Sequence, residues 1–261
     1  MEKESLIFQF NVNNYEGIRD ILHISKELNK PVILGFSETS IAYFGGYSIV
    51  CNLVNNLVNE LNISIPITIH LDHGSYEACF KAIDAGFSSL MYDGSYLSLT
   101  DNIENTKAVV AYAKLKDVLV EGELGIIGTS VDSNSYTSLE DSIKYVNATG
   151  IDFLAPAVGN AHGLYKGKPN INFDLIKDLK SSLNVSLVLH GGSDLSLDIL
   201  KECVEAGINK ININTDLQIV WTNAIRAYLN NEIEVHDPRK IINAGQVAFK
   251  NKIKEYLNIL N

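Results

Sequence analysis

Short apolar runs rich in β-branched residues alternate with amphipathic helical stretches along the whole chain of 261 residues. The strand candidates are residues 6–12, 31–36, 66–72, 88–93, 118–124, 151–158, 185–190 and 210–215. Between them lie segments with apolar residues at helical spacing, such as residues 14–29, 76–86, 101–116 and 196–207. No Pro-, Gly- or Ser-rich linker divides the sequence, so the same pattern continues from end to end.

This alternation predicts an α/β fold built on a parallel sheet. Eight strands, most of them followed by a helix, favour a (β/α)8 TIM barrel that takes residues 1–261 as one domain. An open doubly wound sheet of eight strands is the structural alternative. The last segment, residues 237–260, predicts an extra C-terminal helix after the eighth unit, with Pro238 at its N-terminal edge.

Charge and cysteine content narrow the classes of partner. The formal net charge of -10 argues against nucleic acid or an anionic membrane surface as the main partner. Cys51, Cys79 and Cys203 are scattered and odd in number, which is typical of a reducing compartment rather than of a disulfide scaffold. No apolar leader or membrane-length run is present, and we therefore expect a cytoplasmic protein.

Polar residues stand where the predicted strands end, and in a barrel these ends form the catalytic face. They are Asn11, Ser37, Asp72, His73, Asp93, Glu123, His190, Asn212 and Asn214, and His162 follows the sixth strand. One such histidine is more often structural. Three of them at three strand ends, His73, His162 and His190, predict a divalent metal site with an open position. We interpret His70, which shares a face with Asp72, as a supporting residue.

Two glycine-containing stretches follow the last two predicted strands. They read "LHGGSD" and "ININTD", and they flank the region where many barrels bind phosphate through backbone N–H groups and helix N-termini. Lys166 adds a positive charge close to His162. Although Gly191-Gly192 alone is explained by a tight turn, its place after the seventh strand predicts a phosphate site.

The motifs "HLDHGS", "AIDAGFSSLMYDGS", "AHGLYKG", "LVLHGGS" and "KININTDLQIVWTNAIR" resemble the class II fructose-bisphosphate/tagatose-bisphosphate aldolase family, in order and over nearly the whole chain. The resemblance implies a zinc-dependent (β/α)8 barrel that forms dimers or tetramers, with a monovalent cation as a further requirement left open. It implies reversible cleavage of a phosphorylated sugar, a ketose 1,6-bisphosphate, into dihydroxyacetone phosphate and an aldehyde, commonly glyceraldehyde 3-phosphate.

The resemblance also implies roles for individual residues. His73, His162 and His190 match the zinc ligands, Glu123 and Asp93 match acidic residues around the metal, and Asp72 matches the acid/base at the cleaved bond. The positions that hold dihydroxyacetone phosphate are matched by Gly163, Lys166, Gly191, Gly192, Ser193, Asn212, Asn214 and Thr215. Arg239 matches an arginine that engages the far phosphate, and Ser37 and Asn11 match other active-site positions. Zinc would act as a Lewis acid on the enediolate, in place of a lysine Schiff base.

Two positions depart from the family pattern. Val131 stands, by simple counting, where the family has a glutamate that moves a proton at dihydroxyacetone phosphate; Asp132 is the nearest carboxylate and is the expected substitute. Asp194 stands where the family usually has glycine, beside the predicted phosphate site. A carboxylate there is unfavourable unless it points away or pairs with a cation.

These departures keep other functions open. One alternative is an aldolase for a different phosphorylated sugar, and another is a non-catalytic or accessory aldolase-like subunit. A metallohydrolase with the same three histidines would leave "GGS", "NINT" and "DPR" without a role. The sequence does not decide between fructose and tagatose, between zinc and cobalt, or between oligomer sizes.

Overall fold

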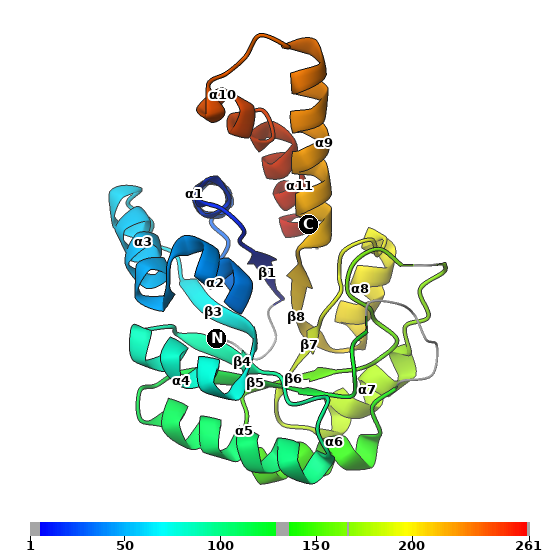
Figure 1. Ribbon diagram of the computed structural model, residues 1–261. Coiled ribbons are helices and arrows are strands. Elements are labelled where there is room, and N and C mark those ends of the chain that lie inside the picture. Colours follow the sequence, from blue (N-terminus) through cyan, green and yellow to red (C-terminus); the bar gives the residue numbers. More distant parts are fainter. Residues whose placement is uncertain (1–5, 129–135, 166, 260–261) are drawn as a thin grey trace.

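The computed structural model of the chain describes residues 6–128, 136–165 and 167–259. Its strands form a closed parallel barrel in which neighbours in sequence are neighbours in space and β8 pairs with β1 (Figure 1). They are β1 (Ile7–Asn11), β2 (Val32–Ser37), β3 (Ile67–Gly74), β4 (Ser89–Tyr92), β5 (Leu119–Leu124), β6 (Phe153–Pro156), β7 (Ser186–Leu189) and β8 (Ile208–Ile213). This confirms the predicted (β/α)8 barrel and excludes the open doubly wound sheet.

Helices follow the strands and surround the barrel (Figure 1). Their bounds are α1 (Tyr15–Leu28), α2 (Glu38–Phe44), α3 (Tyr47–Glu60), α4 (Tyr76–Ala85), α5 (Leu99–Lys114), α6 (Leu139–Thr149), α7 (Phe173–Ser182), α8 (Leu197–Ala206), α9 (Thr215–Asn231), α10 (Pro238–Asn243) and α11 (Gln246–Leu257). Several begin at a serine whose hydroxyl accepts an N–H of the first turn, as Ser75, Ser98 and Ser196 do. The expected C-terminal extension is helical and is divided at Ala244 and Gly245 into α10 and α11.

The main hydrophobic core lies between the barrel and its helices. On β8, Ile211 and Ile213 belong to this core, whereas Lys210 and Asn212 alternate with them and contact other strands across the barrel interior. The buried apolar cluster described inside the barrel is small and consists of Phe153, Ala155 and Val188. The interior of the barrel is therefore largely polar, and this polar interior leads up to the carboxyl ends of the strands.

The segment after β8 forms an arm. Helix α9 extends beyond the barrel and α10 lies at its far end, while α11 returns along α9 and packs against α1 (Figure 1). Helix α10, which contains Arg239, therefore lies away from the barrel (Figure 1).

Within the described part of the chain, no single helix has the length and apolar composition needed to cross a membrane. Helices α2 and α3 meet that test only when taken together, and the two are bent by 75°.

Candidate active site

A cavity of about 240 Å³ opens at the carboxyl ends of the strands. Most of the residues singled out from the sequence line it: Asn11, Ser37, Asp72, His73, His162, Gly163, His190, Gly191, Ser193, Asn212, Asn214 and Thr215. The fold thus brings together side chains from six strand ends. The polar residues predicted at the strand ends therefore identified most of the lining of this cavity from the sequence.

The end of β3 places two consecutive side chains at this cavity. Neighbouring residues in a strand normally point to opposite faces. Here the register with β4 shifts between Leu71 and Gly74, and His73 has a left-handed φ of 50°. Such an irregularity re-aims a side chain, as strand bulges beside active sites commonly do. Both Asp72 and His73 therefore line the cavity.

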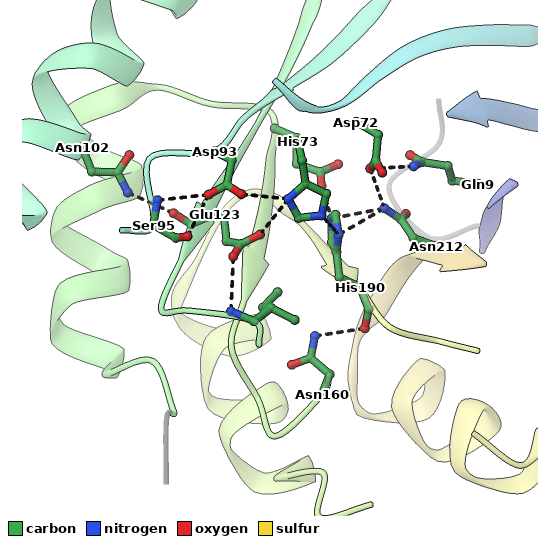
Figure 2. Close-up of polar contacts among 12 residues, drawn as sticks. Gln9, Asp72, His73, Asp93, Ser95, Asn102, Glu123, Asn160, His190 and Asn212 are labelled. Atoms are coloured by element: carbon green, nitrogen blue, oxygen red, sulfur yellow. Dashed lines mark hydrogen bonds and ion pairs between the residues drawn. The ribbon is translucent and has the colours of Figure 1, made fainter. Parts of the chain in front are cut away.

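Amide side chains from two neighbouring strands hold the carboxylate of Asp72 (Figure 2). Gln9 Nε2 donates to Oδ1 at 2.9 Å, Asn11 Nδ2 donates to Oδ2 at 2.8 Å, and Asn212 Nδ2 lies 3.4 Å from Oδ1. Gly35 makes room for these amides, because a Cβ there would lie 2.5 Å from Gln9 Nε2. A carboxylate has about four lone-pair positions, so Asp72 keeps capacity to accept a proton.

Electrostatics keep Asp72 ionised. Burial alone would raise its pKa, but electrostatic interactions with His73 and His190 and the hydrogen bond from Asn11 hold the pKa well below its usual range. A metal cation bound by the same histidines would act in the same direction, because it replaces their protons with a positive charge. Asp72 is therefore ionised, which is the form in which a carboxylate can act as a general base.

The three predicted histidines converge on one point. His73 and His162 lie with their ring centroids 4.8 Å apart, and His190 lies 4.8 Å from His73 and 5.7 Å from His162. One ligand nitrogen from each ring falls in a group whose members lie within 4.8 Å of one another. His162 Nε2 is buried and has no hydrogen-bond partner in the described structure.

Carboxylates behind two of the rings decide which nitrogens face this point (Figure 2). His73 Nδ1 bonds Asp93 Oδ2 at 2.8 Å, which leaves Nε2 facing inward. His190 Nε2 bonds Glu121 Oε1 at 2.7 Å, which leaves Nδ1 facing inward. The two inward nitrogens lie 3.1 Å apart, close to the roughly 3.3 Å that tetrahedral geometry with Zn–N bonds of about 2.0 Å gives. Carboxylates behind ligand histidines are usual in metal sites, so the donor set fits a divalent metal.

The surroundings move the pKa values of two of these rings in opposite directions. Burial disfavours the charged form of His73, yet the carboxylates of Asp72, Asp93 and Glu123 raise its pKa to about 9. Burial, together with the other two imidazoles, lowers the pKa of His162 to about 3. In the absence of a metal, His73 carries the positive charge that the acidic side chains attract.

Asp93 and Glu123 form a second group of possible metal donors with His73. Burial would raise the pKa of Asp93, but hydrogen bonds from His73 and Ser95 lower it to about 2. Burial and the neighbouring charge of Asp93 raise the pKa of Glu123 to about 8, and Glu123 Oε2 has no hydrogen-bond partner in the described structure. Neither acid lines the cavity, so both lie behind His73 as seen from the substrate side.

A second polar layer lies one pleat deeper in the barrel, and of its residues only His70 was predicted from the sequence. Glu121 contacts both His190 and Lys210 Nζ, and Lys210 lies 3.5 Å from His70 Nε2. His70 Nδ1 bonds Ser89 at 2.9 Å, so its supporting role is directed to Lys210 and Ser89 rather than to Asp72. Glu121, His70 and Lys210 are fully buried. Each lies two residues before a strand-end polar residue, a period-2 signal that was present in the sequence.

The loops after β6, β7 and β8 form the other side of the cavity. Ser193 Oγ accepts N–H groups from Asn214 at 3.2 Å and Asp216 at 3.3 Å, so its own proton is free to be donated. Gly191 has φ 64°, and a Cβ there would lie 2.0 Å from Ala161 O, so only glycine lets the two loops approach. Gly192 does not line the cavity, and its N–H donates to Asn212 O, so this N–H is not available to a phosphate there.

Ser37 lines the cavity and also caps α2 through its hydroxyl. Other predicted residues lie elsewhere. Arg239 does not line the cavity; its side chain is 86% exposed and pairs with Asp237. Lys166, Val131 and Asp132 lie outside the described residues.

Comparisons with known proteins agree with this geometry. The family model for class II fructose-bisphosphate aldolases matches residues 1–261. A fructose-bisphosphate aldolase from Staphylococcus aureus (strain Mu50 / ATCC 700699) is 43% identical over 252 residues, covering 94% of this chain and 88% of that protein. A fructose-bisphosphate aldolase from Geobacillus stearothermophilus is 43% identical over 248 residues, covering 93% and 86%.

Solved structures agree as well. The YdjI aldolase from Escherichia coli K12 matches with a TM-score of 0.85 and 29% identity, covering 99% of this chain and 92% of that chain. A full-length family match, relatives above 40% identity and a cavity at the barrel mouth lined by three candidate metal-binding histidines lead to one assignment. The chain belongs to the class II fructose-bisphosphate aldolase family.

Proposed function

We propose that the protein reversibly cleaves fructose 1,6-bisphosphate, with tagatose 1,6-bisphosphate as the next candidate, into dihydroxyacetone phosphate and glyceraldehyde 3-phosphate. The observation that carries the proposal is the ionised carboxylate of Asp72 on the same cavity as three converging histidines. His73, His162 and His190 would hold the cation, which we propose is zinc. When bound, the cation supplies a Lewis acid that disperses the negative charge of the dihydroxyacetone phosphate half.

Asp72 would move the first proton. In the cleavage direction it takes the proton of the C4 hydroxyl, the C3–C4 bond breaks, the aldehyde forms at C4, and the electron pair stays with the three-carbon half that carries the ketone. Gln9, Asn11 and Asn212 keep the carboxylate in place during this transfer. In the condensation direction the same carboxyl returns the proton.

A second group must deliver a proton to C3 of the three-carbon half. We propose Asp132 for this step, because it is the nearest carboxylate to Val131 in the sequence. The described ends of its segment support the assignment: Gly128 O accepts from His162 N at 2.8 Å, and Tyr136 pairs with Val158. Both described ends of the segment therefore contact the loop that carries His162. Asp132→Asn is expected to slow proton exchange at C3 of dihydroxyacetone phosphate, measured by loss of a deuterium label.

The phosphate of the dihydroxyacetone half would lie at the loop side of the cavity. Ser193, Asn214 and Thr215 line it, and α9 begins there with the positive end of its dipole. Gly163, Gly191 and Lys166 belong to the same proposed subsite, to which a monovalent cation would add charge. The protein is proposed to act in the cytoplasm.

We also propose that the protein is a homo-oligomer, a dimer or a tetramer. Arg239 lies on the arm, away from the cavity of its own chain, and Ile233 on the same arm is 75% exposed. A second copy would bring Arg239 to the far phosphate. Mixing Arg239→Ala chains with Asp72→Asn chains should then restore a low KM in hybrid oligomers. Light scattering that gives a monomer mass would contradict this part of the proposal.

Triose phosphate release tests the whole proposal. Zinc-loaded protein is assayed with fructose 1,6-bisphosphate and with tagatose 1,6-bisphosphate, with Asp72→Ala as the control. Zinc-dependent turnover that disappears in the variant is the expected result. If zinc binds and neither sugar is cleaved, the proposed substrates are wrong, and another phosphorylated sugar or a partner subunit becomes the explanation.

A further inference from the structure

Asp194 follows Ser193 at the edge of the proposed phosphate subsite, in a backbone conformation that disfavours a side chain. Its φ is 65°, in the left-handed region. Glycine adopts this conformation without strain, and aspartate and asparagine tolerate it better than most other residues. A strained residue at such a place calls for a compensating contact.

The contact is a hydrogen bond across two loops. Tyr165 N donates to Asp194 Oδ2 at 2.9 Å. The hydroxyl of Tyr165 is partly buried; it donates to Gly191 O at 3.0 Å and accepts from Ala161 N at 3.0 Å. Tyr165 is therefore held at its backbone and at its side chain, and it joins the loop of His162 to the loop of His190 and Ser193.

The backbone of Asp194 is also engaged. Its N–H donates to Asp216 Oδ1 at 3.1 Å, and Asp216 Oδ2 in turn accepts the hydroxyl of Tyr256. The N–H of Asp194 is thus not available to a phosphate oxygen. No ion pair of Asp194 is found among the described residues; Lys252 lies 3.8 Å from Asp216. Because Asp194 directly follows Ser193, its negative charge lies beside the place where a phosphate dianion would bind.

We propose that Asp194 is a positioning residue with two opposing effects: it fastens the loop of His162 to the phosphate loop, and its charge weakens the binding of the substrate phosphate. This inference rests on the proposed function, because it takes the phosphate to bind beside Ser193. The hydrogen bond keeps a metal-binding histidine in place. The charge limits how tightly dihydroxyacetone phosphate is held, and so favours its release.

Two substitutions separate the effects. Asp194→Asn removes the charge but keeps an oxygen that can accept from Tyr165 N–H, and asparagine tolerates the left-handed backbone. Asp194→Gly removes both charge and hydrogen bond and also relieves the backbone strain. Because Asp194 is exposed, neither change disturbs the core.

The first measurement is titration of the zinc-loaded proteins with dihydroxyacetone phosphate. We expect both variants to bind it about threefold to fivefold more tightly than the wild type, the size expected for one exposed charge near a dianion. The difference should shrink as salt is added. The second measurement is the rate at which zinc passes to a chelator, which should rise about threefold in Asp194→Gly and stay unchanged in Asp194→Asn.

Equal dihydroxyacetone phosphate affinity in wild type and Asp194→Asn would overturn the electrostatic effect. Equal zinc release from wild type and Asp194→Gly would overturn the fastening effect. A wild type that holds zinc but does not bind dihydroxyacetone phosphate contradicts the proposed function instead, and it overturns the affinity effect with it. The zinc-release comparison remains decisive in that case, because it needs no substrate.

Discussion

The two sides of the catalytic cavity are held in different ways. We call the residues on the barrel strands, together with His190 directly after β7, the strand side: Gln9, Asn11, Asp72, His73, Glu121, His190, Lys210 and Asn212. We call the residues on the connecting segments the loop side: Ala161, His162, Gly163, Tyr165, Gly191, Ser193 and Asp194. A metal bound by the three histidines would join the two sides, because His162 belongs to one and His73 and His190 to the other.

On the strand side, side chains hold one another. Asp72 is fixed by amides from β1 and β8 (Figure 2). His190 is fixed by Glu121, which contacts Lys210. Nearly all of these groups are buried, where an unpaired polar atom is costly and a paired one has few alternatives. The positions of the proposed proton-transfer group and of two proposed metal ligands are thus set by the barrel itself.

On the loop side, the backbone does most of the holding. His162 is placed by its own N–H bond to Gly128 O, and Tyr165 and Asp194 join the loops through main-chain groups. His162 Nε2 has no hydrogen-bond partner among the described residues. The proposed proton acceptor Asp72 is therefore held by buried side chains, whereas the proposed phosphate subsite is held mainly by contacts to loop backbone.

The largest expected effect concerns the strand side. Asp72→Asn removes the base but keeps its size, so turnover should fall by about 10³-fold, within the range for loss of a general acid/base. Zinc content, measured by atomic absorption, should stay at the wild-type level because Asp72 is not among the three ligands. A variant that keeps a tenth of wild-type turnover would show that another group takes the C4 hydroxyl proton.

The next effect concerns the support beneath His190. Glu121→Gln keeps the shape of the side chain but weakens the bond to His190, and zinc affinity should fall about 10- to 100-fold. The same change leaves Lys210 as an unpaired buried charge, and the free energy of unfolding should fall by about 3–5 kcal/mol. Competition with a chelator and urea denaturation measure the two quantities.

The double variant Glu121→Gln/Lys210→Met is the matched control. It removes the unpaired charge, so it should recover most of the lost stability while zinc affinity stays low. If stability and zinc affinity recover together, Glu121 acts on the metal only through folding, and the strand side has no separate supporting layer.

Glu121 and Lys210 also show which parts of the fold and of the site could be predicted from the sequence. The barrel followed from alternating apolar runs, and the cavity followed from polar residues at strand ends, because parallel strands present those ends at one face. The deeper layer was also encoded, since Gln9, His70, Glu121 and Lys210 each stand two residues before a strand-end polar residue. The deeper layer could therefore have been predicted by moving back two residues along the strand from each strand-end polar residue.

Other features of the site could not be predicted from the pattern of hydrophobic and polar residues. That Asp72 and His73 both face the cavity depends on the shifted register at the end of β3, which hydrophobic periodicity does not report. The bond of Asp194 to Tyr165 N–H depends on how two loops meet, and local sequence does not determine that. The position of Arg239 on an arm follows from how far α9 extends, which apolar spacing does not fix.

Removal of the metal should loosen one side of the cavity only. After chelation, we expect amide hydrogen exchange of residues 161–165 to become about tenfold faster, because the backbone bonds of the loop lose the support of the ligand. Strand-end amides of β1, β3 and β8 should exchange as before, since side-chain bonds that need no metal hold them. Equal acceleration on both sides, followed by mass spectrometry, would mean that the metal stabilises the whole barrel mouth.

The smallest expected effect concerns the loop side. It shows whether the contacts of Tyr165 and Asp194 hold the loop of His162 together or independently. Tyr165→Phe removes the hydroxyl that bonds Ala161 N–H and Gly191 O but keeps the ring. Zinc release to a chelator should then be about threefold faster, as expected for Asp194→Gly, because both changes free the same loop. If the two contacts hold one loop in one position, the double variant should also release zinc only about threefold faster, because contacts in one network are not additive. A ninefold increase would mean that each contact holds the loop independently, and the loop side would then be two separate attachments rather than one.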